Sequence, residues 1–459
     1  MGARRLRIRP PPARKSNYKK GRRMHRLLFG IASSSLLCLA SAATHSASTV
    51  TSEVDAIYAQ TESLYFDLHR NPELSSHETQ TAARLAAGLR ELGFDVTTGI
   101  GGTGVVGVLK NGNGPVILLR TELDALPVEE KTGLPFASKV RTKDDSGADV
   151  GVMHACGHDV HMASWMGTAR IMAGTRNRWR GTLVLIGQPA EETISGASRM
   201  IKDGLLTRFP RPQYALAVHD DPRAPAGIVG THSGPILSNV DSLRVTIYGV
   251  GGHGARPEAA IDPIVIAART VLALQTIVSR EVSPFDSAVV TIGMLHAGTK
   301  NNIIPDQATM ALSVRSLTDT TRQHLLKAIE RNVNAEAVAA GAPKPPLIEK
   351  YESANALVND PALTQRVTAA LTRELGAKQV QDIPPEMASE DFSEFAAAGV
   401  PTLDLKIGAT EQSKFDAAMK GGAPLTALHS PLFAPDWPKT IKAAIAAEVI
   451  SLRELMPAK

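Results

Sequence analysis

The sequence predicts an α/β protein, in which a domain with a mostly parallel central sheet is interrupted by an inserted, ferredoxin-like α+β domain. From about residue 50, helical and strand patterns alternate along the chain, which is typical of a largely parallel sheet covered by helices. Over residues 237–350 the order changes to strand, helix, two strands, helix and strand, as in a ferredoxin-like unit. The length of 459 residues also exceeds what one hydrophobic core usually supports, so we expect two domains.

The larger domain is expected to combine two separate stretches of the chain, residues 50–236 and 351–459. In the first stretch, amphipathic patterns predict helices, and short apolar runs among glycines predict buried strands. The predicted helices cover residues 54–68, 76–92 and 165–173, and the predicted strands cover residues 105–109, 116–119 and 182–187.

The inserted domain, residues 237–350, contains four strand-like segments and two helical patterns. Strands are expected at residues 242–248, 288–294, 309–315 and 345–351, and helices at residues 263–279 and 320–340. Two turn-rich loops interrupt it, residues 249–257 with His253 and residues 298–305 with Asn302. Such loops can bring the backbone close to a ligand, but they are also common as plain turns between strands.

Basic residues are concentrated at the amino terminus. The first 26 residues hold eleven lysines and arginines and no acidic residue, which leaves 39 basic against 45 acidic residues in the rest of the chain. The body of the protein is therefore slightly acidic, and we do not expect it to bind nucleic acid.

Residues 1–42 have the layout of a secretory signal peptide. An apolar stretch at residues 27–40 follows the basic segment, and small residues at 40–42 resemble a cleavage site. The stretch is shorter than the roughly 20 residues of a membrane-spanning helix. We expect cleavage near Ala42 and export to the periplasm, with no membrane attachment afterwards. Met24 is an alternative start, and a disordered basic tail is the alternative to a signal peptide.

Residues 153–161 (MHACGHDVH) contain three histidines, a cysteine and an aspartate, in a chain with 13 histidines and two cysteines. Thiolate and imidazole are preferred ligands of borderline-soft divalent metals. Cys156 and His158 would point the same way if this stretch were extended. Signal cleavage would remove Cys38, and metal binding would protect the remaining thiol in an oxidising compartment. The alternative is a buried cysteine beside surface histidines.

Further side chains that could bind metal follow apolar runs elsewhere in the chain. Glu191 and Glu192 come directly after the predicted strand at residues 182–187, at the end where open α/β sheets place their ligands. If extended, the two carboxylates face opposite ways, so that one could bind metal while the other handles protons. His219 and His429 each follow an apolar run in a similar way. Taken singly, each group could instead be a solvated helix start or a core or capping histidine.

Together these motifs resemble the N-acyl-amino-acid amidohydrolase family, which includes aminoacylase-like, hippurate-hydrolase-like and auxin-conjugate-hydrolase-like enzymes. That family is part of the binuclear metallo-aminopeptidase/carboxypeptidase superfamily. The resemblance runs from about residue 53 to the carboxyl terminus. Its motifs, all in family order, are RTELDALP (120–127), HACGHDVHMA (154–163), GQPAEE (187–192), GGHGARP (251–257), NIIPD (302–306), SEDF (389–392) and LHSPLF (428–433).

The resemblance implies a binuclear metal site and a homodimer or higher homo-oligomer. The implied ions are zinc or manganese, with cobalt as a further candidate, and the inserted domain is implied to be the dimerisation domain. Glu191 matches the family's general base and acid. His253 is similar to the histidine that reaches a substrate in the partner subunit's active site, and Asn302 is similar to a substrate-contacting residue. The family's metal ligands correspond to Cys156, His158, Glu192, His219 and His429.

In the implied mechanism, the two metals polarise the amide carbonyl and lower the pKa of a bound water. Glu191 moves a proton from that water to the leaving amine, and His253 stabilises the oxyanion. Cys156 is a ligand in this scheme and not a nucleophile. Two positions depart from the family pattern. Glu122 stands where aspartate is usual, which puts its orienting role in doubt, and Glu258 stands where histidine is common.

We therefore expect hydrolysis of the amide bond of N-acyl amino acids or related small conjugates. A carboxypeptidase or dipeptidase with the same metal centre is the alternative enzyme. A non-catalytic solute-binding protein on this fold is the alternative of another class, although binding alone does not require Glu191. A cysteine hydrolase using Cys156 would be insensitive to chelators, which distinguishes it from a metalloenzyme.

Overall fold

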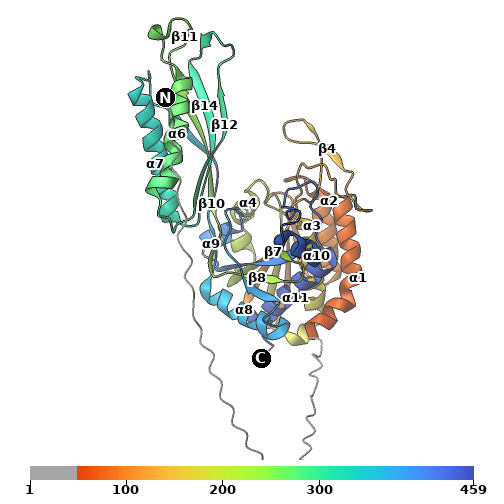
Figure 1. Ribbon diagram of the computed structural model, residues 1–459. Helices are drawn as coiled ribbons and strands as arrows, with labels where there is room; N and C mark the ends of the chain where they lie inside the picture. Colours follow the sequence, from red (N-terminus) through yellow and green to blue (C-terminus); the bar gives the residue numbers. More distant parts are fainter. Residues whose placement is uncertain (1–48, 459) are drawn as a thin grey trace, which may run out of the picture. The chain divides into compact units, whose positions relative to one another are not determined.

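The computed structural model describes residues 49–458. The predicted signal peptide, residues 1–42, and the alternative start at Met24 lie outside the described residues. Over the described range the predicted fold class is confirmed, because the chain forms a mixed, mostly parallel sheet between helices and a separate antiparallel sheet with two helices (Figure 1).

The larger sheet is parallel at its centre and antiparallel at its periphery. Parallel pairs join β6, β3, β7, β18 and β16, whereas β1, β2 and β9 pair antiparallel with their neighbours and β8 pairs antiparallel with β18. β8 (Val229–Thr231) also pairs with β17 (Val380–Asp382). The main strand order is β1 (Asp95–Ile100), β2 (Gly104–Asn111), β6 (Gly181–Gln188), β3 (Val116–Glu122), β7 (Tyr214–Pro225), β18 (Thr402–Thr410), β16 (Leu357–Asn359) and β9 (Gly234–Leu237).

Helices cover both faces of the larger sheet, as buried parallel strands require. On one face pack α1 (Thr49–Arg70), α2 (Thr79–Glu91), α3 (His158–Gly174), α8 (Pro361–Leu375) and α11 (Trp437–Leu455). On the other face pack α4 (Gly196–Lys202), α5 (Leu205–Arg208) and α9 (Ser393–Ala397). The carboxyl ends of β3, β6 and β7 meet at one edge, and Glu191 and Glu192 follow β6 there, while His219 lies on β7.

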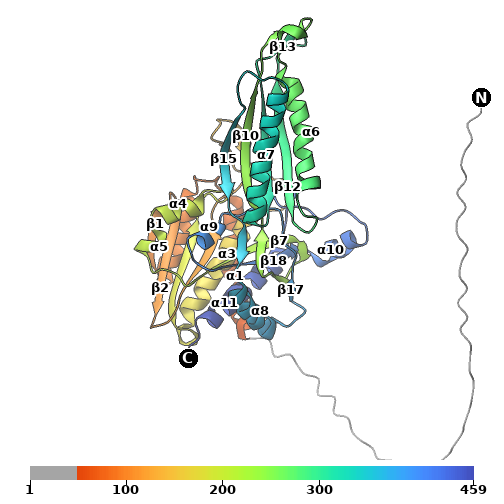
Figure 2. The same cartoon turned by 90° about the vertical axis from the view of Figure 1, so that its left-hand side faces the viewer.

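The second sheet is antiparallel, in the order β12 (Ala288–Ala297), β14 (Gln307–Ser316), β10 (Asn239–Tyr248) and β15 (Leu347–Ala354). Helices α6 (Pro263–Glu281) and α7 (Asp319–Ala339) pack against this sheet around a separate core (Figure 2). The chain order of strand, helix, two strands, helix and strand is the predicted one. The domain boundaries stay predictions, and the last strand of this sheet extends to Ala354.

Both helices of the second sheet begin at caps. The Asp262 carboxylate accepts the N–H of Ile264 at 2.8 Å, and Pro263 occupies the first helical position, where no N–H is needed. Thr318 Oγ1 accepts the N–H of Thr321 at 3.2 Å. The remaining short elements are β4 (Arg141–Lys143), β5 (Asp149–Gly151), β11 (Gly252–His253), β13 (Ile303–Ile304) and α10 (Gln412–Met419).

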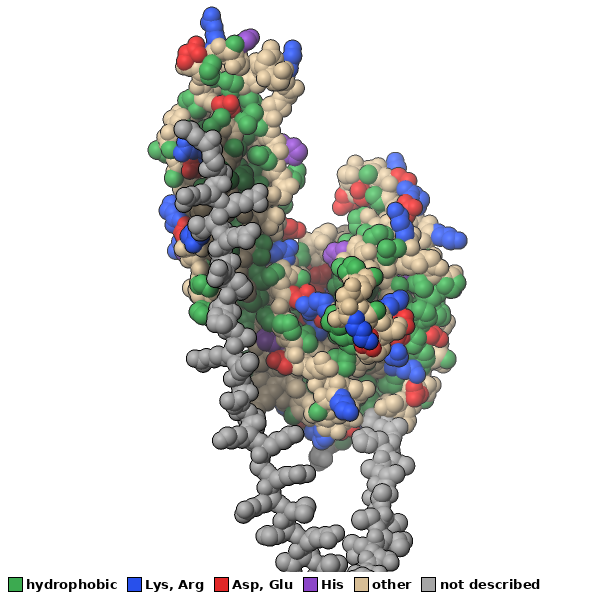
Figure 3. Space-filling model, in the orientation of Figure 1, with side chains coloured by type: hydrophobic (Ala, Val, Ile, Leu, Met, Phe, Trp, Pro, Cys, Tyr) green, Lys and Arg blue, Asp and Glu red, His purple; other side chains and the backbone are tan. Residues whose placement is uncertain are grey.

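Helix α6 has an apolar exposed side. It is the one described helix that is long and apolar enough to cross a membrane, and 33% of the tested window is buried. Ile264, Val265 and Leu272 of α6 are exposed, as are Met294 and Leu295 of β12. Figure 3 shows hydrophobic side chains exposed over this part of the chain. Exposed apolar groups on neighbouring elements are typical of a protein–protein contact.

Candidate metal centre

The cysteine and the central histidine of MHACGHDVH lie on a tight turn into helix α3. The chain is not extended here, because Gly157 has a left-handed φ of 82° and His158 is the first helical residue. The turn brings Cys156 and His158 together with Glu192, so that one potential ligand atom of each lies within 4.8 Å of the others. A β-carbon at residue 157 would lie 2.3 Å from Asp220 Oδ2, so the turn requires glycine.

The two glutamates that follow β6 also lie on a turn, so the condition of an extended chain is not met here either. Ala190, just before them, has a left-handed φ of 50°. The N–H of Glu192 donates to Asp124 Oδ2 at 3.0 Å, which ties the turn to the loop after β3. Both carboxylates approach one ring, since His158 Nε2 is 4.0 Å from Glu191 Oε2 and from Glu192 Oε1.

The five side chains predicted to bind metal meet at one place, although they come from four separate segments. His429 Nε2 lies 3.3 Å from Cys156 Sγ and 3.4 Å from Glu192 Oε1. Cys156 Sγ is 3.6 Å from His219 Nε2 on β7, and the rings of His219 and His158 lie 6.1 Å apart between centroids. One thiol, one carboxylate and three imidazoles form a donor set typical of zinc and related divalent metals.

Hydrogen bonds determine which ring nitrogens face this cluster. His158 Nδ1–H donates to the backbone oxygen of Asp124 at 2.7 Å, and His219 Nδ1–H donates to that of Asp220 at 2.8 Å. Each ring therefore presents the lone pair of Nε2. His158 Nε2 and Glu192 Oε1 are buried without a hydrogen-bond partner. Because buried acceptors without partners are unfavourable, these residues fit a bound cation.

Glu191 is buried beside the same cluster and also beside Glu390 and Asp391, with carboxylate oxygens of the three residues within 4.8 Å of one another. Burial, and then the charges of Glu390, Glu192 and Asp391, raise the pKa of Glu191 well above its ordinary value. A carboxyl group with a raised pKa can hold a proton and release it again near neutral pH, as general acid–base catalysis requires.

The buried thiol of Cys156 is not in the surroundings of a nucleophile. Burial, and then the charges of Glu192, Glu191 and Asp220, raise its pKa well above the ordinary value. Reactive cysteines need the opposite environment, in which a nearby cation lowers the pKa. These surroundings therefore do not activate the sulfur as a nucleophile.

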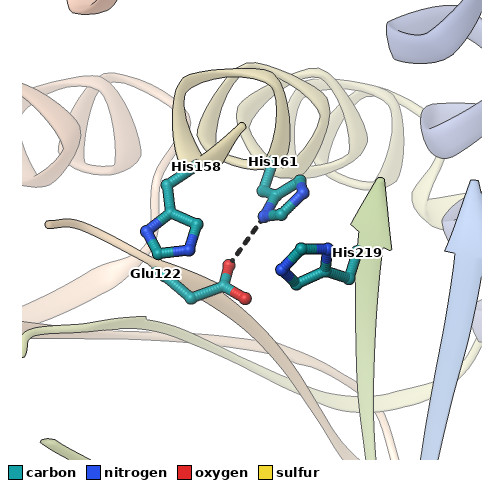
Figure 4. Close-up of side chains that lie close together, drawn as sticks. All are labelled: Glu122, His158, His161 and His219. Carbon is teal, nitrogen blue, oxygen red and sulfur yellow. Dashed lines mark hydrogen bonds and ion pairs between the residues drawn. The ribbon is translucent and has the colours of Figure 1, made fainter. Parts of the chain in front are cut away.

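A buried carboxylate–histidine pair lies behind the predicted ligands (Figure 4). His161 Nδ1–H donates to Glu122 Oε2 at 3.1 Å, and the N–H of Asp220 donates to His161 Nε2 at 2.9 Å. Arg120 donates to the other oxygen of Glu122. The backbone oxygen of Asp220 also accepts the hydrogen bond of His219. Glu122 on β3 is therefore connected through His161 on α3 and Asp220 to His219, a predicted ligand. The longer side chain of Glu122 thus reaches an orienting position that the sequence left in doubt.

His253 and Asn302 lie apart from this cluster within one chain. They belong to the short β11 and β13 pair and its loop, at the end of the second-sheet part that is remote from the larger sheet (Figure 1). The N–H of Gly254 donates to the backbone oxygen of Asn302 at 2.9 Å. The side chains of His253, Asn302 and Glu258 are exposed. Neither His253 nor Asn302 lines the cavity beside Glu191.

Glu191 and four of the predicted ligands line a cavity of about 570 Å³. Three cationic side chains that the sequence analysis missed line it as well: Arg223, Arg315 and Lys406. Arg315 and Lys406 lie inside strands, where neither belongs to a recognisable motif. Their place in the cavity follows only from the packing of the two sheets.

The three cations differ in their partners. Arg223 forms ion pairs with Asp221 and Glu386. Arg315 donates to the backbone oxygen of Met387 at 2.8 Å, but among the described residues it has no ion-pair partner. A guanidinium group in this state has donors available for an anionic ligand.

Comparison with known proteins identifies the family. Residues 118–418 match the sequence profile of Peptidase family M20/M25/M40. The chain belongs to this family. Hippurate hydrolase of Campylobacter jejuni is 38% identical over 345 residues, which cover 75% of this chain and 86% of the relative. N-acetyl-L-cysteine deacetylase of Bacillus subtilis is 36% identical over 327 residues, 71% of this chain and 75% of the relative.

A solved M20 structure supports the same conclusion. The Bacillus subtilis YXEP protein, described as a dinuclear metal binding peptidase from the M20 family, matches with a TM-score of 0.70 at 30% identity. The match covers 86% of this chain and 98% of that one. The predicted family and enzyme class are confirmed: the protein is a hydrolase of the M20 amidohydrolase type, acting on non-cyclic amide C–N bonds. The role of each site residue and the identity of the metal stay predictions.

Proposed function

We propose that this M20 protein is a metal-dependent amidohydrolase that cleaves the amide bond of N-acyl amino acids or related small conjugates. The observation that carries the proposal is the meeting of Glu191 with one thiol, one carboxylate and three imidazoles beside a single cavity. The relatives named hippurate hydrolase and N-acetyl-L-cysteine deacetylase support this class of substrate.

The metal site is proposed to hold two divalent ions, zinc or manganese, with cobalt as a further candidate. When bound, such ions polarise an amide carbonyl and lower the pKa of water. The unpartnered His158 Nε2 and Glu192 Oε1 support a cation at this place. The proposed ligands are Cys156, His158, Glu192, His219 and His429.

Glu191 is proposed to accept a proton from the attacking water and to return it to the leaving amine nitrogen. The water oxygen then bonds to the carbonyl carbon while the C–N bond breaks, so the products are a carboxylic acid and an amine. Burial of Glu191 keeps bulk water away from the transferred proton. Burial, and then the charges of Glu390, Glu192 and Asp391, raise its pKa, which helps it to hold the proton between the two steps.

Arg315 is proposed to bind the α-carboxylate of the amino-acid part of the substrate. Its guanidinium group lines the cavity and is only partly exposed. The group already donates to Met387 and Ser389, and it lacks a carboxylate partner among the described residues. A planar guanidinium binds a carboxylate through two parallel hydrogen bonds, which would orient the scissile amide.

The protein is proposed to form a homodimer or higher homo-oligomer through the part of the chain that carries the second sheet, with α6 and α7. The exposed apolar side chains of α6 and β12 support this contact, since Leu272 is 71% exposed and Met294 is 54% exposed. In such an assembly, His253 and Asn302 would contact the substrate of the partner subunit. Their exposure, and their absence from the lining of the chain's own cavity, support that arrangement.

Export to the periplasm is a further proposal that rests on the sequence of residues 1–42. The basic segment, the short apolar stretch and the small residues before position 43 support a cleavable signal peptide. Amino-terminal sequencing of protein recovered from the periplasm would show the cleavage near Ala42. A mature protein that retains these residues would contradict this proposal.

The experiment that tests the function is the substitution Glu191→Gln. Turnover of N-acyl amino acids is expected to fall about 10²- to 10⁴-fold, since the proton acceptor is lost. Metal content, measured by elemental analysis, is expected to stay unchanged. Hydrolysis that survives this substitution would disprove the mechanism. Loss of activity in chelator with recovery on adding metal would exclude a cysteine hydrolase.

A panel of N-acyl amino acids and dipeptides tests the alternative enzyme. A relative named thermostable carboxypeptidase 2 of Saccharolobus solfataricus, 36% identical over 72% of this chain and 80% of its own length, favours that alternative. Faster hydrolysis of dipeptides than of N-acyl amino acids would support a dipeptidase or carboxypeptidase. Tight binding without turnover of either class would support the solute-binding alternative.

A further inference from the structure

Lys406 lies on strand β18 directly beside a predicted metal ligand. In the parallel pairing of β18 with β7, Lys406 is opposite His219, and Figure 2 shows the two strands side by side. Paired residues on neighbouring strands project from the same face, and the strands are about 4.8 Å apart. The Lys406 ammonium and the His219 imidazole therefore line the same cavity.

The ammonium group of Lys406 is buried but only partly satisfied. Lys406 is 5% exposed, and its Nζ lies 2.7 Å from Asp404 Oδ2, the one ion pair that it forms among the described residues. An ammonium has three N–H donors, so two remain for other acceptors. A buried charge of this kind is unfavourable compared with an apolar side chain of similar size. Its position in the cavity wall points to an anionic ligand.

The third cation of the cavity is already occupied by carboxylates. Arg223 contacts both Asp221 and Glu386, which satisfy its charge. Lys406 and Arg315 are therefore the two cavity cations with donors left for a substrate. They come from different sheets, Lys406 from β18 and Arg315 from β14, so they approach a bound molecule from two sides.

We propose that Lys406 binds a second anionic group of the substrate, so that the preferred substrates are N-acyl amino acids with two carboxylates. The inference rests on the proposed amidohydrolase function, in which Arg315 takes the α-carboxylate. The second carboxylate belongs either to an acidic side chain, as in N-acetylglutamate, or to a dicarboxylic acyl group, as in an N-succinyl amino acid. Both present the same charged oxygens to the ammonium.

Matched substrate pairs test this inference and identify the source of the second carboxylate. We would compare kcat/KM for N-acetylglutamate with N-acetylglutamine, and for N-succinylalanine with N-butyrylalanine. A preference of about tenfold or more for the acidic member of one pair is expected from one added charged hydrogen bond. Hydrolysis of the neutral members with no preference for either acidic member would overturn the inference.

Removal of the ion pair provides the structural control. The double variant Asp404→Asn/Lys406→Met leaves no buried charge unpaired, so it is designed to fold. It is expected to lose the preference for the acidic substrate while it still hydrolyses the neutral one. Lys414→Met, which changes an exposed lysine on α10, is expected to keep the preference. A preference that persists in the double variant would overturn the role of Lys406.

Binding to the Glu191→Gln protein separates failure of this inference from failure of the proposed function. Calorimetry gives a Kd for each member of a pair without any turnover. If the wild-type protein hydrolyses none of these substrates, the proposed function fails, and the Kd values still decide the role of Lys406. Tighter binding of the acidic member that disappears when Asp404→Asn/Lys406→Met is added supports the inference, and equal binding overturns it.

Discussion

Gly157 faces the carboxylate of Asp220 so closely that a β-carbon on residue 157 would lie 2.3 Å from Asp220 Oδ2. The same glycine has a φ of 82°, which begins helix α3 directly at His158. On the other side of the contact, the backbone oxygen of Asp220 holds the ring of His219. The placement of two predicted ligands, His158 and His219, thus depends on a glycine at residue 157.

Substitution Gly157→Ala is expected to abolish metal binding at the predicted centre. The new β-carbon must displace Asp220, and the left-handed backbone adds about 1–2 kcal/mol of strain. Gly147→Ala is the matched control, because Gly147 has a φ of 83° and a β-carbon there would meet no atom within 4 Å. Metal content after dialysis would be measured for both variants. Metal binding by Gly157→Ala equal to that of Gly147→Ala would contradict the steric argument.

Substitution Glu122→Asp is expected to weaken metal binding about 10- to 100-fold, the usual effect of losing a group that orients a ligand. Aspartate is one methylene shorter, so it cannot keep both Arg120 and the 3.1 Å contact with His161. Affinity would be measured by competition with a chromophoric chelator. The prediction applies to this chain, in which Arg120 and His161 are spaced to contact a glutamate. It does not apply to family members that have the usual aspartate at this position.

Glu448→Asp is the matched control for that measurement. Glu448 is another fully buried glutamate that contacts helix α3, where it accepts hydrogen bonds from Thr168 at 2.5 Å and Ser164 at 3.3 Å. Shortening it is expected to lower the melting temperature without changing metal affinity. Equal losses of affinity in the two variants would show that Glu122 acts only through general stability.

The residue types of the metal centre could be predicted from the sequence, but its geometry could not. Cys156 and His158 were identified by their chemistry, whereas their convergence depends on the left-handed Gly157, and a glycine in a sequence marks many other kinds of turn. Lys406 lies on strand β18, which the sequence analysis did not single out. Only the pairing of that strand with His219 shows where its charge lies.

The fold was predictable where the chain is strongly periodic. The pattern at residues 320–340 predicted α7 (Asp319–Ala339) to within a residue at each end, because an amphipathic helix of this length repeats its pattern several times. Strand β1 (Asp95–Ile100) was missed. It pairs with only one neighbour at the sheet edge and is largely exposed, so it has no apolar run to mark it.

The stability of the protein is expected to depend on pH through Glu448. Burial raises the pKa of its carboxyl to about 8 from an ordinary value of 4.5, although two hydroxyls donate to it. The folded state therefore favours the protonated form, and this contribution is full below pH 4.5 and is lost as pH rises through 8. A tenfold difference in proton affinity between the folded and unfolded states corresponds to about 1.4 kcal/mol of stability.

Glu448→Gln lacks this titration, so its melting temperature relative to wild type is expected to rise between pH 5 and 8 and to level off above pH 8. Thermal unfolding followed by circular dichroism in a series of buffers would measure the difference. A difference that stays constant across that range would show that Glu448 does not titrate in the folded protein.

Exchange of subunits tests whether His253 acts across a subunit interface. Homo-oligomers of Glu191→Gln and of His253→Ala are each expected to be nearly inactive. In a mixed dimer, the subunit that keeps Glu191 receives His253 from its partner, so one complete site forms. For random mixing of dimers, about one quarter of all sites become complete. Activity in the mixture, followed over the time of exchange, measures this recovery.

The exchange experiment discriminates sharply because the two residues lie in different parts of one chain. Glu191 lines the cavity that residues of both sheets enclose, whereas His253 lies on β11 and does not line that cavity. If His253 served the site of its own chain, both kinds of subunit would carry one defective site each, and mixing would restore nothing. A mixture that stays inactive, although light scattering and tagged-subunit capture prove exchange, would therefore rule out the role of His253 in the partner's site.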